Sequence, residues 1–396
     1  MIIRMIETLR LAEFPNLLWV VVEDAEGNRG TGESYLGAGA TEAYIHEIAA
    51  PLLIGQDARD RDAIRRRLHP YVGYNGAGAE VRGASAIDMA LWDLWGRNLA
   101  QPVWRLLGGR SRERIRTYNT CAGYAYVRGA VGQASENWGL GTEGPYEDLE
   151  GFLTDAGKLA ESLLAQNITG MKIWPFDTAA EASQGAAITP AQLAEAVEPF
   201  AKIRQAVGND MQIMLELHLL WQPHVVAEIA RALEPFDIYW IEDPMPATAP
   251  GTWADLRARV RPKIAGSETM ASRTAFRAMM EARGVDVVIM DLGWCGGLTE
   301  AKAIASMAEA FHLPFAPHDC TGPLAWAACT NLSINAPNAL IQESVRAFYS
   351  GWYGELARNL PAVEEGHIRL PEGVGMIAEL KPEIWERADA TRRQTG

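Results

Sequence analysis

The feature that most constrains this chain is a ladder of short apolar runs between residues 212 and 343. Each run ends in a side chain that can bind a metal ion or move a proton. The six residues are Glu216, Glu242, Glu268, Asp291, His318 and Glu343. Successive members are 26, 26, 23, 27 and 25 residues apart, which is about the length of a buried strand, a loop, a packing helix and a return loop. The near-constant spacing predicts one repeated strand–helix unit.

Alternating strands and helices indicate a parallel sheet. If the sheet closes into a barrel, the C-terminal ends of all its strands lie on one face, where barrel enzymes carry their chemistry. The six polar residues are therefore expected to converge on a single pocket. Any one of them alone is more simply explained as an ordinary strand-end cap, but six in register are hard to obtain that way.

Residues 1 to about 115 follow a different pattern. Strands are predicted at 2–11, 17–24 and 29–35, and helices at 40–54, 58–68 and 85–99. Strands followed by helices indicate an α+β domain. We therefore predict three parts, namely a domain at 1–114, a barrel at 115–345, and a C-terminal segment at 346–396 that returns to the first domain. Within that last segment, Ile368 is expected to pack on the N-terminal domain.

Composition excludes several classes of protein. The net charge of -14 leaves no basic stripe for nucleic acid or for an anionic membrane. The N-terminus carries charges inside its apolar run, unlike a signal peptide, and no apolar stretch is long enough to cross a bilayer. The four scattered cysteines argue against a disulfide scaffold or a zinc cluster. A cytoplasmic protein that binds neither nucleic acid nor membrane is predicted.

Glu216, Glu242 and Glu268 would present three carboxylates from neighbouring strands. Packed together without a counter-ion, they would repel one another and raise one another's pKa values. A divalent cation resolves this conflict. Hard oxygen ligands suit Mg²⁺, with Mn²⁺ as a similar alternative, whereas Zn²⁺ is disfavoured because the set contains no histidine. One Mg²⁺ per subunit is the predicted cofactor.

Two histidines are candidates for proton transfer. His318 and Asp291 end successive strands, and a carboxylate on one ring nitrogen would fix the tautomer and raise the basicity of the other, as a general base needs. His218 follows Glu216 by two residues, so both side chains are expected on one face of the strand, where His218 suits a general acid. A divalent ion, a base and an opposed acid suit removal of a proton alpha to a carboxylate, with the ion stabilising the enediolate.

Six motifs carry a resemblance to a known family. They are Ser85-Ala-Ile-Asp-Met-Ala-Leu-Trp-Asp, Leu106-Leu-Gly-Gly, Ile241-Glu-Asp-Pro, Gly266-Ser-Glu-Thr, Asp291-Leu-Gly-Trp-Cys-Gly-Gly-Leu-Thr-Glu-Ala and Ala316-Pro-His-Asp. Over nearly its whole length the chain resembles the enolase superfamily, in the mandelate racemase subgroup. The resemblance implies an α/β fold, a modified (β/α)7β TIM-like barrel under an α+β N-terminal capping domain completed by the C-terminal segment. It also implies Mg²⁺ on the three glutamates, a His318–Asp291 dyad, and Glu343 hydrogen-bonded to the reaction intermediate.

Within the superfamily, Glu216-Leu-His218 with the dyad is most similar to acid-sugar dehydratases of the D-galactonate dehydratase type. The first ligand in those relatives is usually aspartate, so Glu216 is one methylene longer. Racemases and cycloisomerases of the superfamily carry Lys-x-Lys where this chain has Lys172-Ile-Trp174, so Trp174 removes the usual second base. Lys172 is expected either to bind the substrate carboxylate or to form a structural salt bridge, with about equal weight.

The same resemblance implies that loops of the capping domain set specificity. Phe14, Tyr74 and Asn75 are the candidates from those loops, and Trp174 is a further substrate-binding candidate from the barrel. The segment 71–79, rich in glycine and tyrosine, suits a mobile lid and a plain connection equally well. The long segment 122–148 is expected to be functional or disordered.

The predicted function is the Mg²⁺-dependent dehydration of a sugar acid, an aldonate or aldarate, to a 2-keto-3-deoxy acid. His318 would remove the C2 proton, Lys172 and Glu343 would help to stabilise the enediolate, and His218 would protonate the departing C3 hydroxyl. The alternative is a racemase or epimerase with the same metal and dyad. A non-catalytic relative is disfavoured because every chemical position is filled, and a hydrolytic metal barrel because histidine ligands are missing. The expected partners are a small carboxylate substrate and further copies of the chain in a homo-oligomer.

Overall fold

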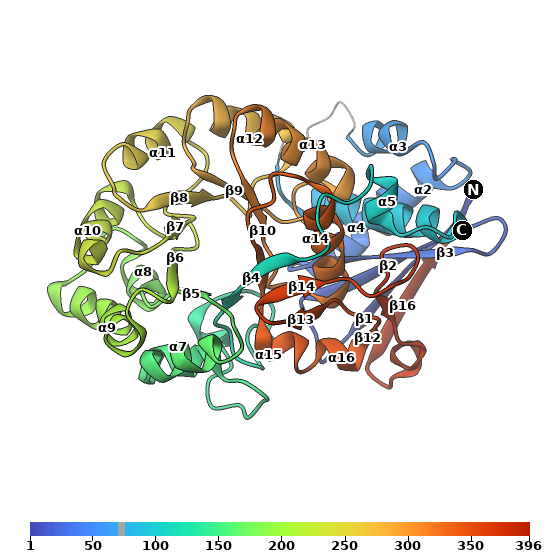
Figure 1. Cartoon of the computed structure of the whole chain (residues 1–396). Helices are drawn as coiled ribbons and strands as arrows, with labels where there is room; N and C mark the ends of the chain where they lie inside the picture. The colour runs from blue at the N-terminus through green and yellow to red at the C-terminus, as the bar shows by residue number, and fades with distance from the viewer. Residues whose placement is uncertain (70–75) are drawn as a thin grey trace.

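The structure of the protein is a computed structural model that describes residues 1–69 and 76–396. A barrel fills one side of the molecule, and a smaller unit built on a second sheet fills the other (Figure 1). Both chain termini lie at the smaller unit (Figure 1). The predicted fold class, a modified barrel with an α+β capping domain, is confirmed.

The capping unit is built on a four-stranded antiparallel sheet in the order β16-β1-β2-β3. Its strands are β1 (Ile3–Leu11), β2 (Leu17–Asp24), β3 (Arg29–Tyr35) and β16 (Ala390–Thr395). Every residue of β2 is buried, as expected for a strand inside a sheet that is covered on both faces. The last strand comes from the far end of the chain, and Thr395 lies opposite Ile6 of β1.

Helices cover this sheet and connect it to the barrel. They are α1 (Ala38–Tyr44), the π-helix η1 (Ile45–Ala49), α2 (Ala50–Leu53), α3 (Arg61–Leu68), α4 (Ala79–Asn98) and α5 (Val103–Leu106). The long helix α4 packs on β3 at very close range, because Gly32 has no side chain. A Cβ atom there would lie 1.9 Å from the carbonyl oxygen of Ala86. α4 begins at Ala79 rather than at Ser85, since its buried face extends back to Val81.

The barrel consists of parallel strands that follow one another around a closed ring. They are β4 (Ile115–Thr120), β5 (Gly170–Ile173), β6 (Gln212–Glu216), β7 (Trp240–Glu242), β8 (Lys263–Gly266), β9 (Val287–Met290), β10 (Phe315–Pro317) and β11 (Gln342–Ser344). β11 pairs with β4, and Phe315 of β10 bridges to Ala339 just before β11, which closes the ring. In this order β6 and β10 stand on opposite sides of the barrel.

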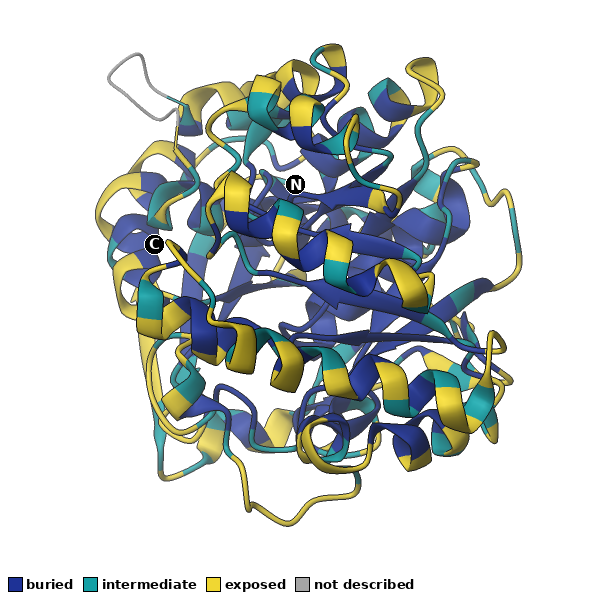
Figure 2. Ribbon diagram, turned by 90° about the vertical axis from the view of Figure 1, so that its left-hand side faces the viewer, coloured by how far each residue is buried: buried dark blue, intermediate teal, exposed yellow. Residues whose placement is uncertain are grey.

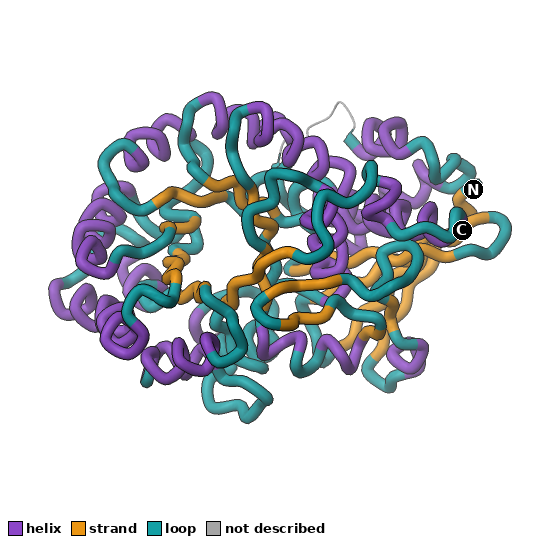
Figure 3. The backbone as a smooth tube through the Cα atoms, in the orientation of Figure 1, coloured by secondary structure: helices purple, strands orange, loops and turns teal. Residues whose placement is uncertain are grey.

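Helices surround the barrel strands (Figure 3). They are α6 (Asp148–Thr154), α7 (Ala156–Leu164), α8 (Asp177–Ser183), α9 (Pro190–Val207), α10 (Pro223–Leu233), α11 (Pro250–Arg257), α12 (Ser272–Glu281), α13 (Gly297–Ala310) and α14 (Pro323–Asn335), with short 3-10 turns η2 (Ser135–Asn137) and η3 (Glu234–Phe236). Most are exposed on their outer face and buried toward the strands (Figure 2). α14 is buried along its whole length because it lies between the barrel and the capping unit.

The start of α9 shows how the sequence fixes one of these helices. The Thr189 hydroxyl accepts a hydrogen bond from the Gln192 backbone N–H, and the Gln192 side chain accepts one from the Thr189 N–H. Pro190 occupies the first turn, where its missing N–H is not needed. The helix therefore begins directly after its Thr189 cap.

The C-terminal segment contacts both parts of the molecule. Its elements are α15 (Arg346–Tyr349), α16 (Tyr353–Leu356), β12 (Ala357–Arg358), β13 (Ala362–Glu364), β14 (His367–Arg369), β15 (Glu379–Leu380), η4 (Pro382–Glu386) and β16. Ile368 was expected to pack on the N-terminal domain, and this is wrong, because Ile368 in β14 pairs with Ile115 of the barrel strand β4. The Ile368 side chain is fully buried there, and of the C-terminal segment only β16 joins the capping sheet. The boundaries at 114 and 345 stay a prediction.

The long segment after β4 forms an ordered connection between the two units. The Asn137 side chain bonds to the backbone of Ala130 and Gly132. The Asn16 side chain, from the loop between β1 and β2, donates to the carbonyl oxygens of Val127 and Ala130. The segment is thus tied to the capping unit near the open end of the barrel. Among the described residues, no helix combines the length and apolar character needed to cross a membrane.

Candidate active site

The ladder residues lie at the C-terminal ends of the barrel strands. Glu216 and Glu242 end β6 and β7 and stand opposite each other in register. The other four follow in order, with Glu268 after β8, Asp291 after β9, His318 after β10, and Glu343 within β11. All six side chains are buried. Parallel strands that each end in a polar residue therefore bring these groups to one end of the barrel.

Three carboxylates cluster within this site. Oxygen atoms of Glu216, Glu242 and Glu268 all lie within 4.8 Å of one another. Burial raises the pKa of Glu242 and of Glu268, and the charge of Glu216 raises both further. A set of buried, hard oxygen donors at this separation fits a divalent cation such as Mg²⁺, which would relieve the repulsion.

The Lys172 ammonium is a counter-ion for this cluster. Its Nζ lies 2.8 Å from Glu242, 3.2 Å from Glu216 and 3.0 Å from Glu343. Burial alone would lower the pKa of Lys172, but these carboxylates outweigh it and raise that pKa well above its usual range. Of the two roles expected for Lys172, this geometry displays the salt bridge. It leaves the role toward a substrate carboxylate open to test.

His318 and Asp291 form a hydrogen-bonded pair. His318 Nδ1 lies 2.7 Å from Asp291 Oδ2, and His318 Nε2 lies 3.1 Å from Glu268 Oε2. Asp291 is held in turn, because its other oxygen accepts the Gly293 N–H at 2.6 Å. Burial would lower the pKa of His318, but the Glu268 and Glu343 carboxylates raise it well above its usual range. A cation on Glu268 would weaken that effect and return the imidazole toward its neutral, basic form.

His218 has an aspartate partner that sequence reasoning missed. His218 Nδ1 lies 2.7 Å from Asp177 Oδ2, at the start of α8. Burial would lower the pKa of His218, but Asp177 and Glu216 raise it to about 10, so the ring holds a proton at neutral pH. The one sequence signal for Asp177 is that it is a polar residue shortly after the apolar run that ends at Trp174. A protonated imidazole held by a carboxylate is suited to donate a proton.

Glu343 is surrounded by donors. One oxygen accepts the Asp319 backbone N–H at 2.7 Å, and the other is hydrogen-bonded by the Thr120 hydroxyl and contacts Lys172. Burial would raise the pKa of Glu343, but the Lys172 and His318 charges and these hydrogen bonds lower it to about 2. The side chain is therefore an ionised acceptor that positions its neighbours. Its bond to an intermediate stays a prediction.

Trp174 lies beside the candidate acid. Its ring meets the His218 ring edge-on at 5.9 Å and packs against Tyr126 and Phe152. The side chain is fully buried, and its indole N–H has no hydrogen-bond partner in the described structure. Buried indole N–H groups usually find one. Trp174 stands where the resemblance would place a second lysine base, and an indole cannot act as a base.

Three residues of the capping loops were predicted to bind substrate, and the structure describes one of them. Phe14 is buried against Trp352, at 5.1 Å between ring centres, and the Arg128 guanidinium lies 4.4 Å from its ring centre. It lines a cavity of about 10 Å³ between the capping unit and the barrel. Tyr74 and Asn75 lie outside the described residues. Contact of any of the three with substrate stays a prediction.

Most of the chain matches known protein families. Residues 12–108 match the N-terminal domain of the mandelate racemase / muconate lactonizing enzyme family, and residues 155–384 match the enolase C-terminal domain-like family. The crystal structure of an enolase of the mandelate racemase subgroup from Agrobacterium tumefaciens is 46% identical, covers 100% of this chain and 99% of its own, and superposes with a TM-score of 0.89. An enolase from an environmental sample of the Sargasso Sea is 40% identical over 100% of this chain and 99% of its own, also with a TM-score of 0.89.

Two more distant relatives carry the name of an activity. A D-galactonate dehydratase from Ralstonia nicotianae is 32% identical over 92% of this chain and 89% of that protein. A D-galactonate dehydratase from Klebsiella pneumoniae is 30% identical over 86% of this chain and 81% of its own. The fold and the relatives define a barrel enzyme, with a cluster of titratable side chains at the C-terminal ends of the strands. The chain belongs to the mandelate racemase / muconate lactonizing enzyme family of the enolase superfamily.

Proposed function

We propose that this enzyme is a Mg²⁺-dependent dehydratase of a sugar acid, an aldonate or aldarate, and forms a 2-keto-3-deoxy acid. The observation that carries the proposal is the pair of His–Asp contacts on opposite sides of the barrel. His318 and Asp291 follow β10 and β9, and His218 follows β6 and contacts Asp177 at the start of α8. Dehydration needs one group to take a proton from carbon and another to give one to the leaving oxygen.

His318 is the proposed base. Asp291 holds its Nδ1, so Nε2 is the nitrogen that faces the carboxylate cluster and a substrate bound there. A neutral imidazole in this tautomer can accept the C2 proton. General-base catalysis of this kind contributes typically 10²–10⁴-fold.

His218 is the proposed acid. Its proton is stabilised by Asp177, and it stands across the barrel from the base. Removal of the C2 proton on one side and departure of the C3 hydroxyl on the other give an enol, which becomes the 2-keto-3-deoxy acid on taking up a proton at C3. The alternative, return of a proton to C2 by His218, would make an epimerase, and it would lack the second lysine base because that position is Trp174.

Glu216, Glu242 and Glu268 would hold the metal ion, and their mutual repulsion supports that role. When bound, Mg²⁺ supplies positive charge that stabilises an enediolate. Glu216 is one methylene longer than the aspartate usual in dehydratase relatives, and its Oε1 accepts the Leu217 and His218 backbone N–H groups. Those two bonds hold Oε1 against the Glu216 backbone, while Oε2 accepts a hydrogen bond from the Lys172 ammonium at 3.2 Å.

Two further expectations remain proposals. A reducing, cytoplasmic compartment is supported by four buried cysteines that form no disulfide in the described chain. Assembly as a homo-oligomer that acts on a small carboxylate substrate rests on the family resemblance.

The direct test is a panel of sugar acids with matched C2 and C3 configurations, assayed for 2-keto acid with and without Mg²⁺. At least one acid should give a 2-keto-3-deoxy product that requires the metal. Clean C2 epimers across the panel, with no keto acid, would establish the epimerase instead.

A further inference from the structure

A guanidinium group from the capping unit lies close to the candidate base. Arg82 is in the first turn of α4, and its Nη1 donates to the carbonyl oxygens of Tyr35 at 3.1 Å and Leu36 at 3.0 Å. Its Cζ lies 4.7 Å from the centre of the Trp294 ring. Two hydrogen bonds and one aromatic face together fix the plane of the guanidinium.

Trp294 connects Arg82 to the active site. The Trp294 ring centre lies 5.3 Å from that of His318, so Arg82 Cζ is no more than about 10 Å from the imidazole centre. Trp294 Nε1 donates to the same Tyr35 carbonyl that Arg82 holds. Burial lowers the pKa of Arg82, while the nearby Asp291 and Glu268 carboxylates raise it. The guanidinium therefore lies beside the candidate site, on the capping-unit side, packed against the Trp294 ring.

Arg82 is not committed to a carboxylate. Its Nε is buried without a hydrogen-bond partner, and within the described residues Nη2 makes no hydrogen bond and no acidic group lies within ion-pair distance. Nε and Nη2 form the edge of a guanidinium that binds a carboxylate through two parallel hydrogen bonds. The other cations of the site differ, because Lys172 contacts glutamates and His218 contacts Asp177.

We propose that Arg82 binds a second carboxylate of the substrate, at the end of the carbon chain away from the reacting carbons. The enzyme would then prefer aldarates, which carry a carboxylate at both ends, over aldonates. This inference rests on the proposed dehydratase function and narrows its substrate class.

Charge and length both support this assignment. The strand ends carry many carboxylates, so a second negative group on the substrate would be repelled unless a free cation received it. With C2 beside His318, the terminal carboxyl carbon of an extended six-carbon acid lies roughly 5 Å farther along the chain. That reach is compatible with the separation between His318 and Arg82. A purely structural arginine could make the same hydrogen bonds to Tyr35 and Leu36. The experiment must therefore distinguish substrate binding by Arg82 from a structural role.

The test uses pairs of acids that differ only in the terminal group, such as galactonate with galactarate and gluconate with glucarate. For the pair whose configuration the enzyme accepts, kcat/KM of the wild type should be at least about 10-fold higher for the di-acid. In Arg82→Gln it should fall about 100-fold for the di-acid, mostly through KM, and less than about threefold for the mono-acid. Arg82→Lys keeps the charge without the fork and should lose an intermediate amount.

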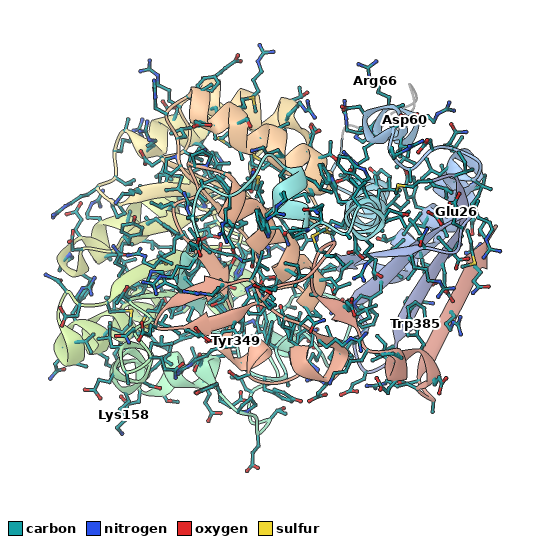
Figure 4. All side chains as sticks on the ribbon, turned by 45° about the vertical axis from the view of Figure 1, so that its right-hand side comes forward. Glu26, Asp60, Arg66, Lys158, Tyr349 and Trp385 are labelled. Atoms are coloured by element: carbon teal, nitrogen blue, oxygen red, sulfur yellow. The ribbon has the colours of Figure 1, made fainter. Side chains whose placement is uncertain are left out.

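Arg66→Gln is the matched control, since it removes one positive charge from exposed helix α3 at the edge of the molecule (Figure 4) and should leave the preference unchanged. Dehydration of aldonates in preference to aldarates would overturn the Arg82 proposal and leave the proposed function standing. Equal losses for both acids in the two Arg82 variants would assign Arg82 a structural role. If neither aldonates nor aldarates give a keto acid, both proposals are overturned.

Discussion

His218 Nδ1 lies 2.7 Å from Asp177 Oδ2, the same distance that separates His318 Nδ1 from Asp291 Oδ2. The two histidines follow β6 and β10, which stand on opposite sides of the barrel. In each pair a buried aspartate fixes the ring through Nδ1 and leaves Nε2 for chemistry. The site thus contains two similar histidine–aspartate pairs, and their different neighbours suit them to the opposite tasks proposed above.

Asp177→Asn tests the pair on β6. The amide keeps the size of the side chain but no longer stabilises the imidazolium, so proton donation to the leaving oxygen should weaken. We expect kcat for keto acid formation to fall by roughly 10²-fold, while exchange of the substrate C2 proton with solvent deuterium continues. Mass spectrometry of recovered substrate and product measures both rates in one reaction.

A substrate with fluoride at C3 provides the control, because fluoride departs without general-acid help. Elimination of fluoride should be nearly the same in Asp177→Asn and in the wild type. A variant that loses fluoride elimination and proton exchange together would mean that Asp177 supports the site as a whole.

His318→Asn tests the base. Asparagine keeps some hydrogen bonding but cannot accept the C2 proton, so turnover and C2 exchange should both fall by about 10³-fold or more. Asp291→Asn should lose less, because it misorients the imidazole rather than deleting it. Single-turnover kinetics would measure these rates, and circular dichroism would show whether the fold is retained. Wild-type turnover in His318→Asn would mean that another residue is the base.

Removal of the metal should abolish activity without unfolding the chain. Lys172 already places one positive charge between Glu216 and Glu242, so the metal-free cluster is only partly uncompensated. Dialysis against a chelator should give an inactive, folded protein that regains activity with Mg²⁺, and calorimetry should find one site per subunit. Glu242→Gln should weaken Mg²⁺ binding in the same titration. Full activity with no metal detected by elemental analysis would contradict the assignment.

Glu33 should make the stability of the chain depend on pH. This buried side chain accepts hydrogen bonds from Trp19 Nε1 and from the Ala325 N–H at the start of α14. Burial raises its pKa to about 7, although these hydrogen bonds oppose the shift. The folded state therefore keeps a proton that the unfolded chain loses near pH 4.5, and stability falls as pH rises from there through about 7. The loss from this one group is at most about 3 kcal/mol.

Melting temperatures at pH 5 and pH 8, with saturating Mg²⁺, measure this effect. Glu33→Gln should be less stable than the wild type at pH 5, since its amide turns a donor toward a backbone or indole N–H, but its own decline toward pH 8 should be smaller. Glu26→Gln, on the exposed turn between β2 and β3 (Figure 4), should keep the wild-type decline. Equal declines in all three proteins would refute the role of Glu33.

The sequence predicted the cluster of ladder residues because its signal is local. Glu216, Glu242 and Glu268 each follow an apolar run, and parallel strands bring such positions together whatever the loops do. Asp177 has no comparable signal. It lies 41 residues before His218, after a strand and at the start of a short helix, and only the packing of α8 brings the two together.

Side-chain packing between the capping unit and the barrel also could not be predicted from the sequence. Phe14 stands in a capping loop, as predicted, but its burial results from Trp352 and Arg128, which come from two distant segments. Ile368 was assigned to the wrong neighbour for the same reason. An apolar residue at 368 fits either sheet, and the pairing with Ile115 is decided by where the chain turns after the barrel.

Dehydration and epimerisation share their first step, so the decisive prediction concerns the second step. In D₂O the wild type should accumulate a 2-keto-3-deoxy acid with deuterium entering at C3. His218→Asn should largely block this product, because the C3 hydroxyl then leaves without a proton donor. The proposed base, His318, and its partner Asp291 lie across the barrel and are unchanged, so the variant should still exchange the C2 proton. An epimerase would instead give the C2 epimer carrying deuterium at C2 and no keto acid. Trp174 favours the first outcome, since its indole supplies no base beside His218, and NMR of the recovered acids distinguishes the two.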